Sequence, residues 1–317
     1  MSLSNQSCGS SVDDLRRYQH HVYAVVYSVI LAPGLLGNVL ALWVFQAYVR
    51  ETKRGVVFMM NLAVADLLQV LSLPLRIYYY LNHTWPFGRP LCMLCFYLKY
   101  VNMYASIFFL VCVSVRRCEL IMHPLRYRSN RRRGDMCVCA AGWLLVCLGC
   151  LPFPLLRITS LTPDLYTHTA PYDLTPNPYA SRAELVGFIL PLILVLTCAC
   201  LSAGSLRRAL RMVLSCAGVF LLCFSPYHVT MPLDFLAKAD ALGSCEVREM
   251  VLRCHPVTLC LASLNSGLDP LMYYFTTDEF RRRFSRPEIP ESFNSLLLRM
   301  WTSAGLRLEL PVCGQKR

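Results

Sequence analysis

An aspartate, a proline and a tyrosine interrupt the last of seven long apolar stretches, in the run Asp269-Pro270-Leu271-Met272-Tyr273. An ionisable group in an apolar segment is costly, and in a membrane span it marks a functional site by default. Proline frees a backbone carbonyl, which a membrane helix tolerates only where neighbours or water satisfy it. The alternative is a chance kink in a core helix. The run predicts a functional polar site within the apolar core.

Basic and aromatic residues form a second group, near the other ends of the apolar stretches. Arg76, Tyr79 and Tyr80 are spaced i, i+3 and i+4, so they share one helix face. Lys99 lies about two turns inside the third stretch. Converging cations in a partly dry cavity require an anion, so we expect a phosphate or carboxylate ligand. The predicted ligand-binding residues are Arg76, Tyr79, Lys99, Tyr100, Arg157, His228, Lys238 and Arg253.

Some of these cations have a simpler interpretation. Long basic side chains anchor helix ends at a membrane interface by extending their charge into water. This alternative applies first to Lys238 and Arg253, whereas Arg76 and Lys99 lie too deep in their apolar stretches.

The elements that position these residues follow from composition. Of the 317 residues, 56% are hydrophobic and 16% charged, whereas soluble domains have about 45–50% and about 25%. Each apolar stretch reaches the roughly 20 residues that a helix needs to cross a bilayer. We predict an all-α membrane protein, a seven-transmembrane helix bundle over residues 22–275. The expected helices are Val22–Val49, Val56–Leu81, Leu91–Met122, Met136–Leu156, Leu185–Leu206, Arg208–Leu236 and Val251–Phe275.

The basic residues predict the orientation, because lysine and arginine concentrate in cytoplasmic loops. The net charge is +12, and the basic residues lie between the apolar stretches rather than in a separate polar domain. This distribution argues against nucleic acid as a partner. Residues 1–21 are an expected extracellular segment without a cleavable signal peptide, so the first helix would be a signal anchor. Sequons at Asn5 and Asn82 fall on the same outer side and predict glycosylation. We therefore expect a multi-pass plasma-membrane protein with its N-terminus outside.

Residues 276–286 follow the seventh stretch and include Phe280-Arg281-Arg282-Arg283-Phe284. Aromatic residues flanking arginines suit a short amphipathic eighth helix on the inner membrane face. Residues 287–317 are an expected disordered cytoplasmic tail, in which Cys313 is a candidate for acylation.

Taken in order, the motifs of the apolar stretches resemble those of the rhodopsin-like G-protein-coupled receptors. These motifs are Gly37-Asn38, Leu62-Ala63-Val64-Ala65-Asp66, Ser114-Val115-Arg116-Arg117-Cys118, Trp143, Pro191, Cys223-Phe224-Ser225-Pro226 and the Asp-Pro-x-x-Tyr run. Residues 71–80, 96–106 and 224–228 are similar to the purinergic-related branch that includes the lysophosphatidylserine receptors. The resemblance implies a receptor, not an enzyme, that transmits ligand binding to a heterotrimeric G protein.

The resemblance also implies roles for single residues. Asp66, Ser106, Asn265 and Asp269 would hold an allosteric sodium ion, and no other cofactor is expected. Two carboxylates so near each other cannot both stay ionised without a cation or a proton. The alternative is therefore a protonated polar cluster. The implied activation switch is Arg117, Ile107, Pro191, Phe220, Phe224, Pro226, Asp269, Pro270 and Tyr273.

Arg117 matches the arginine at the cytoplasmic end of the family's third helix, but its usual acidic neighbour is Arg116. We expect the restraining ion pair to be absent, the two arginines to repel each other, and the inactive state to be less well held. The alternative is that both arginines only anchor the helix at the interface.

A lysophosphatidylserine suits the predicted ligand site, because its head group is anionic and its acyl chain would pack on apolar helix walls. A nucleotide would need more base-stacking and hydrogen-bonding groups, and a peptide is harder to exclude. Other classes are a non-signalling decoy receptor, a transporter, for which internal repeats are missing, and an aspartyl-type enzyme built on Asp66 and Asp269.

The chain departs from the family at two loops. No cysteine lies between Arg157 and Ala183, so Cys92 lacks the family's partner, and the resemblance leaves Cys8 and Cys245 as the outer disulfide. No pair of CxxC motifs has zinc spacing. The third inner loop is reduced to a turn near Gly204, which predicts short inner ends of the fifth and sixth helices and weak G-protein coupling.

Overall fold

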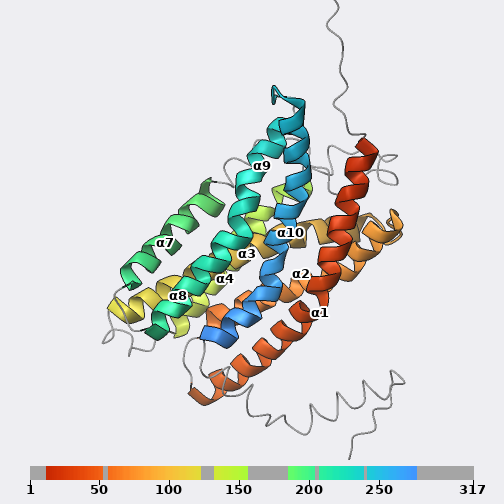
Figure 1. Cartoon of the computed structure of the whole chain (residues 1–317). Helices are drawn as coiled ribbons and strands as arrows, with labels where there is room; N and C mark the ends of the chain where they lie inside the picture. Colours follow the sequence, from red (N-terminus) through yellow and green to blue (C-terminus); the bar gives the residue numbers. More distant parts are fainter. Residues whose placement is uncertain are drawn as a thin grey trace, which may run out of the picture.

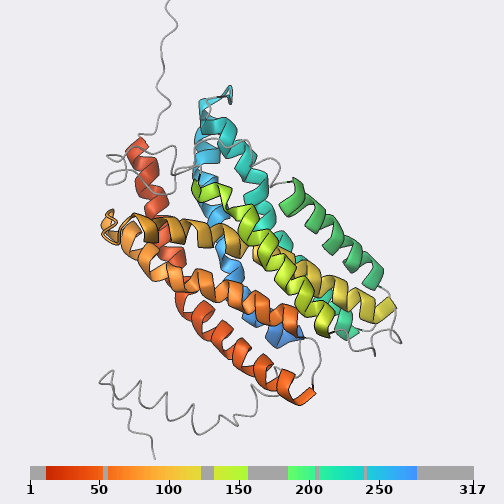
Figure 2. The same cartoon turned by 180° about the vertical axis from the view of Figure 1, so that it is seen from behind.

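The computed structural model describes residues 12–52, 56–122, 132–155, 185–203, 207–238 and 241–276. Nearly all of them lie in helices packed side by side (Figures 1 and 2). Because η3 continues into α7, and α8 through η4 into α9, the chain crosses the bundle seven times, as predicted. The elements are α1 (Val12–Thr52), α2 (Val57–Asn82), α3 (Arg89–Met122), α4 (Arg132–Cys150), η3 (Leu185–Ile189), α7 (Leu190–Ser202), α8 (Arg207–Val219), η4 (Phe220–Phe224), α9 (Ser225–Lys238) and α10 (Cys245–Thr276).

Two helices extend beyond their apolar stretches. α1 begins at Val12 and α10 at Cys245, both earlier than the hydrophobic pattern predicts. Apolar composition marks only the part of a helix that lies in hydrocarbon, whereas backbone hydrogen bonding continues through polar turns. Asp13, Asp14 and Glu246 lie in these first turns, where acidic side chains complement the helix dipole.

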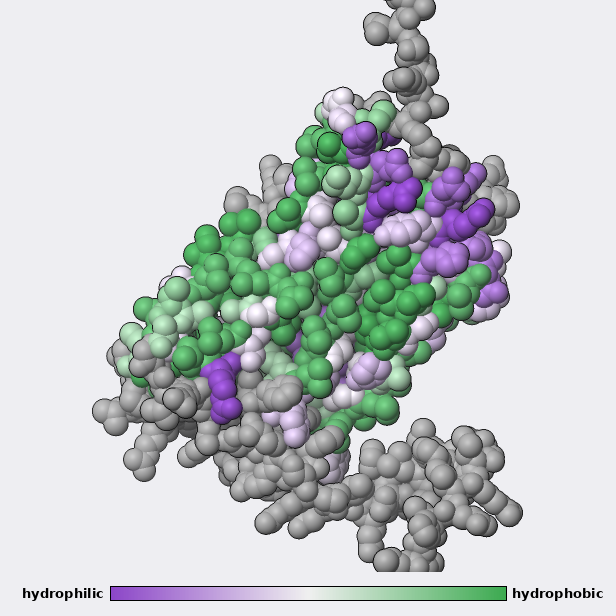
Figure 3. Space-filling model, viewed as in Figure 1, coloured by the Kyte–Doolittle hydropathy of each residue, from purple (hydrophilic) through white to green (hydrophobic). Residues whose placement is uncertain are grey.

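Apolar side chains cover much of the outside of the bundle, and hydrophilic ones gather at the end where α1 begins (Figure 3). Four segments are long and apolar enough to cross a membrane by composition alone: Asp13–Ala47, Val57–Asn82, Arg133–Leu155 and Leu210–Lys238. α3 and α10 also carry buried polar side chains, among them Lys99, Asn102, Asn265 and Asp269, and α2 adds Asp66 and Arg76. The polar groups predicted to function therefore lie on three helices.

α3 lies at the centre and packs against α2, α4, α7 and α8, while α10 lies against α1 and α9. Two hydrogen bonds fix α4 on its neighbours. Trp143 Nε1 donates to Asn61 Oδ1 of α2 at 2.8 Å, and the Tyr97 hydroxyl of α3 donates to the Cys147 carbonyl at 2.7 Å. The motif tryptophan thus positions α4.

The two π-helical segments each precede a proline of the predicted switch. η3 ends two residues before Pro191, and η4 ends two residues before Pro226. A proline removes a backbone donor and crowds the preceding turn, and a π-turn is one way for a helix to accommodate the mismatch. The expected kink at Pro226 is therefore accompanied by a widened turn containing Phe220 and Phe224.

Gly37 and Asn38 explain how α1 packs on the proline of α10. A Cβ atom at Gly37 would lie 2.8 Å from the Pro270 ring, so only glycine permits this approach. Pro270 lacks the amide that would bond the Ser266 carbonyl in a regular helix. Asn38 Nδ2 donates to that carbonyl at 2.7 Å and satisfies it.

The connection between α7 and α8 is short. α7 ends at Ser202 and α8 begins at Arg207, so residues 203–206 join them, as the spacing predicts. The expected eighth helix and tail lie outside the described residues, as does the loop that contains Arg157.

Candidate functional site

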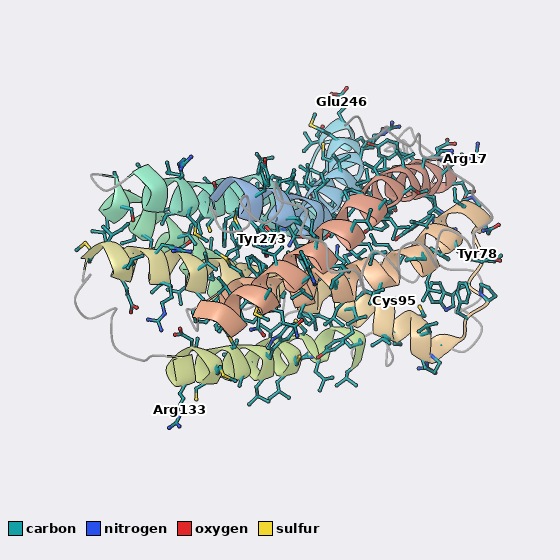
Figure 4. All side chains as sticks on the ribbon, turned by 90° about the horizontal axis from the view of Figure 1, so that it is seen from below. Arg17, Tyr78, Cys95, Arg133, Glu246 and Tyr273 are labelled. Carbon is teal, nitrogen blue, oxygen red and sulfur yellow. The ribbon has the colours of Figure 1, made fainter. Side chains whose placement is uncertain are left out.

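Two groups of polar side chains lie inside the bundle. The residues labelled in Figure 4 show where the two ends of the bundle are. Arg17 and Tyr78 lie toward one end, Arg133 lies at the opposite end, and Tyr273 lies between them (Figure 4). We call the first the outer end and the second the inner end, after the predicted orientation.

The first group, the central cluster, comprises Asp66, Asn102, Ser106, Asn265 and Asp269, all buried. Asn102 Nδ2 donates to Asp66 Oδ1 at 3.1 Å and to Ser106 Oγ at 3.4 Å. Asn265 Nδ2 donates to Asp66 Oδ1 at 3.4 Å, and the carboxyl groups of Asp66 and Asp269 interact. The structure therefore brings together the four residues predicted to bind sodium and adds Asn102.

The central cluster has more acceptors than donors. Asp66 Oδ2, Asn102 Oδ1, Asn265 Oδ1 and both Asp269 carboxyl oxygens are buried and receive no hydrogen bond from the described residues. Buried polar atoms normally have a partner, and hard cations take oxygen ligands. This set of oxygens fits a small hard cation, and equally a shared proton.

Tyr273 ties the predicted switch to two other helices. Its hydroxyl donates to the Met59 carbonyl of α2 at 3.4 Å, and its ring packs edge-on against Phe45 of α1 with centroids 5.2 Å apart. The side chain is fully buried. Moving α10 at this point would require both contacts to break.

The second group, the outer site, begins with Arg76, which is fully buried. Its guanidinium donates to the Cys95 carbonyl of α3 and lies 6.0 Å from the ring centroid of Tyr27. A buried charge is costly unless it is paired or hydrogen-bonded. Arg76 is therefore placed deep in the bundle, as its position in the apolar stretch predicts.

Tyr79 and Tyr80, predicted on the same face as Arg76, are also buried and join an aromatic group with α1. The ring centroid of Tyr80 lies 4.9 Å from that of Tyr23, and the ring of His20 lies about equally close to Tyr79 and Tyr80, at 5.3 and 5.2 Å. The face predicted to bind ligand is thus packed against α1 at its outer part.

Lys99 and Tyr100 lie on α3, one turn below the Cys95 carbonyl. Lys99 is buried, and its ammonium lies 5.3 Å from the Tyr100 ring centroid. Tyr100 stacks on Phe153, which follows α4, with centroids 4.5 Å apart and planes 8° apart. Aromatic faces attract cations, so this surface can hold a buried ammonium.

His228 occupies an aromatic stack rather than an exposed position. Its ring lies 4.1 Å from that of Phe188 in η3, and Phe188 in turn lies 5.6 Å from Phe220 in η4. The predicted ligand residue His228 is thus connected through Phe188 to the predicted switch residue Phe220. Phe220 also packs edge-on against Phe224.

Two of the predicted ligand residues, Lys238 and Arg253, have acidic partners one helical turn away. These are the cations that could simply anchor helix ends at the membrane interface. Lys238 Nζ lies 2.9 Å from Asp234 Oδ2, and an Arg253 nitrogen lies 2.7 Å from Glu249 Oε1. The Arg253 side chain is 48% exposed. An anionic ligand would compete with these carboxylates, so both residues are weaker candidates than Arg76 and Lys99.

At the inner end, the expected repulsion between Arg116 and Arg117 is wrong. Arg116 forms ion pairs with Glu119, at 2.6 Å, and with Asp135 in the first turn of α4. Those carboxylates neutralise Arg116 and draw it toward α4. Arg117 forms no ion pair among the described residues, and a less well held inactive state stays a prediction.

Several predicted sites fall on the edge of the described residues or beyond it. Asn82 is exposed at the end of α2, where a glycan could be attached, and Asn5 lies outside the described residues. Cys245 is disulfide-bonded, but Cys8 is not described, so the pairing stays a prediction. Cys92 is a buried thiol.

Sequence reasoning missed the residues that complete these groups. Asp234 could have been found, because a carboxylate four residues before Lys238 is a common helix pair. Asn102 and Phe188 give no such signal, since an isolated polar or aromatic residue in an apolar stretch does not reveal which neighbour it faces.

This architecture, seven crossings around a buried carboxylate cluster with an outer cationic site, is that of a membrane receptor. Residues 37–273 match the family described as 7 transmembrane receptor (rhodopsin family). The chain is 53% identical over 309 residues to "Probable G-protein coupled receptor 174" of Mus musculus, covering 91% of this chain and 92% of that protein. It is 45% identical over 288 residues to a putative purinoceptor of Homo sapiens, covering 85% of each chain.

A more distant relative is "Lysophosphatidic acid receptor 4" of Homo sapiens, 34% identical over 302 residues, covering 89% of this chain and 80% of that protein. The chain therefore belongs to the rhodopsin family of seven-transmembrane receptors, in its purinergic-related branch. It is a cell-membrane receptor rather than an enzyme, and the predicted family and fold are confirmed.

Proposed function

We propose that this receptor binds an anionic lysophospholipid, lysophosphatidylserine foremost, and passes the binding signal to a heterotrimeric G protein. The observation that carries the proposal is the burial of two cations, Arg76 and Lys99, on adjacent helices α2 and α3. Fully buried cations are rare, and within membrane spans they mark functional sites by default. A phosphate would give both side chains a strong charge-assisted partner.

The surroundings of these cations favour a lipid over a nucleotide. Tyr27, Tyr80, Tyr100 and Phe153 supply apolar and aromatic surface around Arg76 and Lys99, which suits a glycerol backbone and an acyl chain. One relative is named as a lysophosphatidic acid receptor, which supports the same chemical class. Another is named as a putative purinoceptor, so a nucleotide is the second candidate.

A G-protein activation assay in cells that lack related receptors tests the proposal. Lysophosphatidylserine should activate the wild-type receptor in a concentration-dependent manner, and nucleoside di- and triphosphates should not. Activation by a nucleotide alone, or by no lysophospholipid at normal surface expression, would overturn it. A receptor that binds the lipid without activating any G protein would be the decoy that the short α7–α8 connection suggests.

We further propose that the central cluster binds a sodium ion in the inactive state. Five buried oxygens without donors support this assignment, and Asp66 and Asp269 would supply the compensating charge. The N-terminus would face the extracellular side, as the distribution of basic residues indicates.

A further inference from the structure

One buried acid lies near the outer site, and the proposed function gives it no role. The buried acids among the described residues are Asp66, Asp135, Asp234 and Asp269. Asp66 and Asp269 belong to the central cluster, and Asp135 pairs with Arg116 at the inner end. Asp234 lies near the outer end of α9, on the seam with α10.

Asp234 is held in a connected set of polar side chains. Its Oδ2 lies 2.9 Å from Lys238 Nζ and 3.9 Å from His255 Nε2 of α10. His255 Nδ1 lies 3.2 Å from Thr230 Oγ1, which lies 2.7 Å from Thr258 Oγ1. The carboxylate is therefore paired within α9 by Lys238 and lies beside the hydrogen-bonded group of His255, Thr230 and Thr258.

Ring contacts connect Asp234 to the outer site. His255, whose Nε2 lies 3.9 Å from Asp234 Oδ2, has its ring centroid 5.4 Å from that of Tyr227. Tyr227 in turn packs edge-on against the predicted ligand residue His228, with centroids 5.2 Å apart. Asp234 therefore lies at the edge of the outer site, where a charged group of a bound head group could approach it.

The present partner of Asp234, the Lys238 ammonium, indicates which chemical group of a ligand Asp234 could bind. Lys238 presents a primary ammonium, and its side chain is 31% exposed against 11% for Asp234. A long lysine side chain at a helix end can turn into water, which would leave the carboxylate for another ammonium. Exchanging one ammonium for another keeps the buried carboxylate paired, whereas leaving it unpaired would be costly.

We propose that Asp234 determines head-group specificity by binding the ammonium of an anionic lysophospholipid with an amino-acid head group, in exchange for Lys238. The inference rests on the proposed function and deepens it, because it assigns the amino group of the ligand to a named carboxylate. Arg76 and Lys99 would bind the anionic groups, and Asp234 would distinguish an amino-acid head group from one that has only anionic groups.

The test compares two agonists on the full-length receptor in a G-protein activation assay. One is lysophosphatidylserine, and the other is its analogue in which 3-hydroxypropionate replaces serine, so that only the amino group is missing. The readout is the ratio of the two potencies, because a merely structural role of Asp234 would change both potencies alike. Wild type should prefer the amine-bearing ligand, and no preference would overturn the inference whatever the variants show.

Three variants with measured surface expression complete the experiment. Asp234→Asn keeps the shape of the side chain and should lower the ratio by about tenfold or more. Lys238→Met removes the competing ammonium and should leave the ratio unchanged or raise it. Glu249→Gln is the matched control, because Glu249 also accepts a cation one turn away, and it should leave the ratio unchanged.

The outcomes separate the two proposals. If wild type responds to neither lipid, the proposed function fails and this inference with it. If wild type responds but the ratio is unchanged in Asp234→Asn, or falls equally in Lys238→Met, then Asp234 and Lys238 are only a structural pair and this inference alone fails.

Discussion

The outer site and the central cluster are both buried and polar, but their charges are opposite. In the outer site, Arg76 and Lys99 lie among aromatic rings, and the nearby acid Asp234 is already paired with Lys238. In the central cluster, Asp66 and Asp269 lie among amide and hydroxyl groups, with no basic side chain bonded to them among the described residues. The two groups share α2, which carries Asp66 and Arg76, and α3, which carries Lys99 and Asn102.

The difference shows which kind of ligand each group is suited to bind. The outer site has buried cations, which favour an anionic head group, and the central cluster has buried oxygens, which favour a cation or a proton. Because a displacement of α2 or α3 affects both groups, a ligand at one can change the affinity at the other, which is a coupling between two sites.

The largest expected effect is on the outer site. Arg76→Ala or Lys99→Ala should cost about 2–5 kcal/mol, roughly 30-fold or more in agonist potency, because a desolvated charged contact is lost. The measurement is potency in a G-protein activation assay at matched surface expression. Since Arg76 is fully buried, Arg76→Lys serves as a second variant that keeps the charge.

Arg253→Ala is the matched control for these substitutions. Its side chain is about half exposed and paired with Glu249, and exposed ion pairs contribute about 0–1 kcal/mol. Equal losses at Arg253 and Lys99 would mean that general surface charge, rather than a buried anion site, governs potency.

A second prediction concerns the packing that supports the central cluster. Asn38→Ala removes the donor to the Ser266 carbonyl, and leaving such a buried group unsatisfied costs about 1–3 kcal/mol. The purified receptor should therefore unfold at a lower temperature. Ser28→Ala, which removes the hydroxyl of an exposed residue that donates to the Ala24 carbonyl of the same helix, should have a smaller effect.

The third prediction tests whether the central cluster binds a cation. Agonist affinity should be lower in sodium than in N-methylglucamine at equal ionic strength, by the roughly 5–150-fold typical of coupled sites. Asp66→Asn should abolish the difference, because it removes one carboxylate. If wild type shows no sodium effect, the cluster is a protonated polar network.

The smallest expected effect is at the inner end, where residues 203–206 join α7 to α8. Inserting about ten to twenty flexible residues after Gly204 should strengthen G-protein coupling, because longer loops cost little closure entropy and free α8 to move. Lipid binding should not change. Strong G-protein coupling of the unmodified chain, with no gain on insertion, would contradict the idea that the short connection restrains α8.

The sequence predicted the parts of this structure that depend on composition and on motif order. Seven apolar stretches gave the bundle, and the motifs placed Asp66, Asn265 and Asp269 correctly at one cluster. Periodicity could not show that two helices extend past the hydrocarbon, because polar helical turns resemble loops in composition. It also could not show that Arg116 turns toward Asp135, since that contact joins residues on different helices.

The widened turns before Pro191 and Pro226 were equally beyond prediction. A proline indicates that a helix must adapt, but whether it bends or forms a π-turn depends on neighbours such as Phe188 and Phe220. The pairing of Lys238 with Asp234 follows the i, i+4 spacing, so it could have been predicted from the sequence, but it was missed.

The most direct test of an anion-binding outer site is equilibrium binding of two single-chain lipids to the purified receptor. Lysophosphatidylserine and a monoacylglycerol with the same acyl chain differ in that only the first carries anionic groups. Lysophosphatidylserine should bind at least about 30-fold more tightly, the equivalent of one desolvated charged contact. Equal affinity would show that the acyl chain alone is recognised, and it would contradict the role given to Arg76 and Lys99.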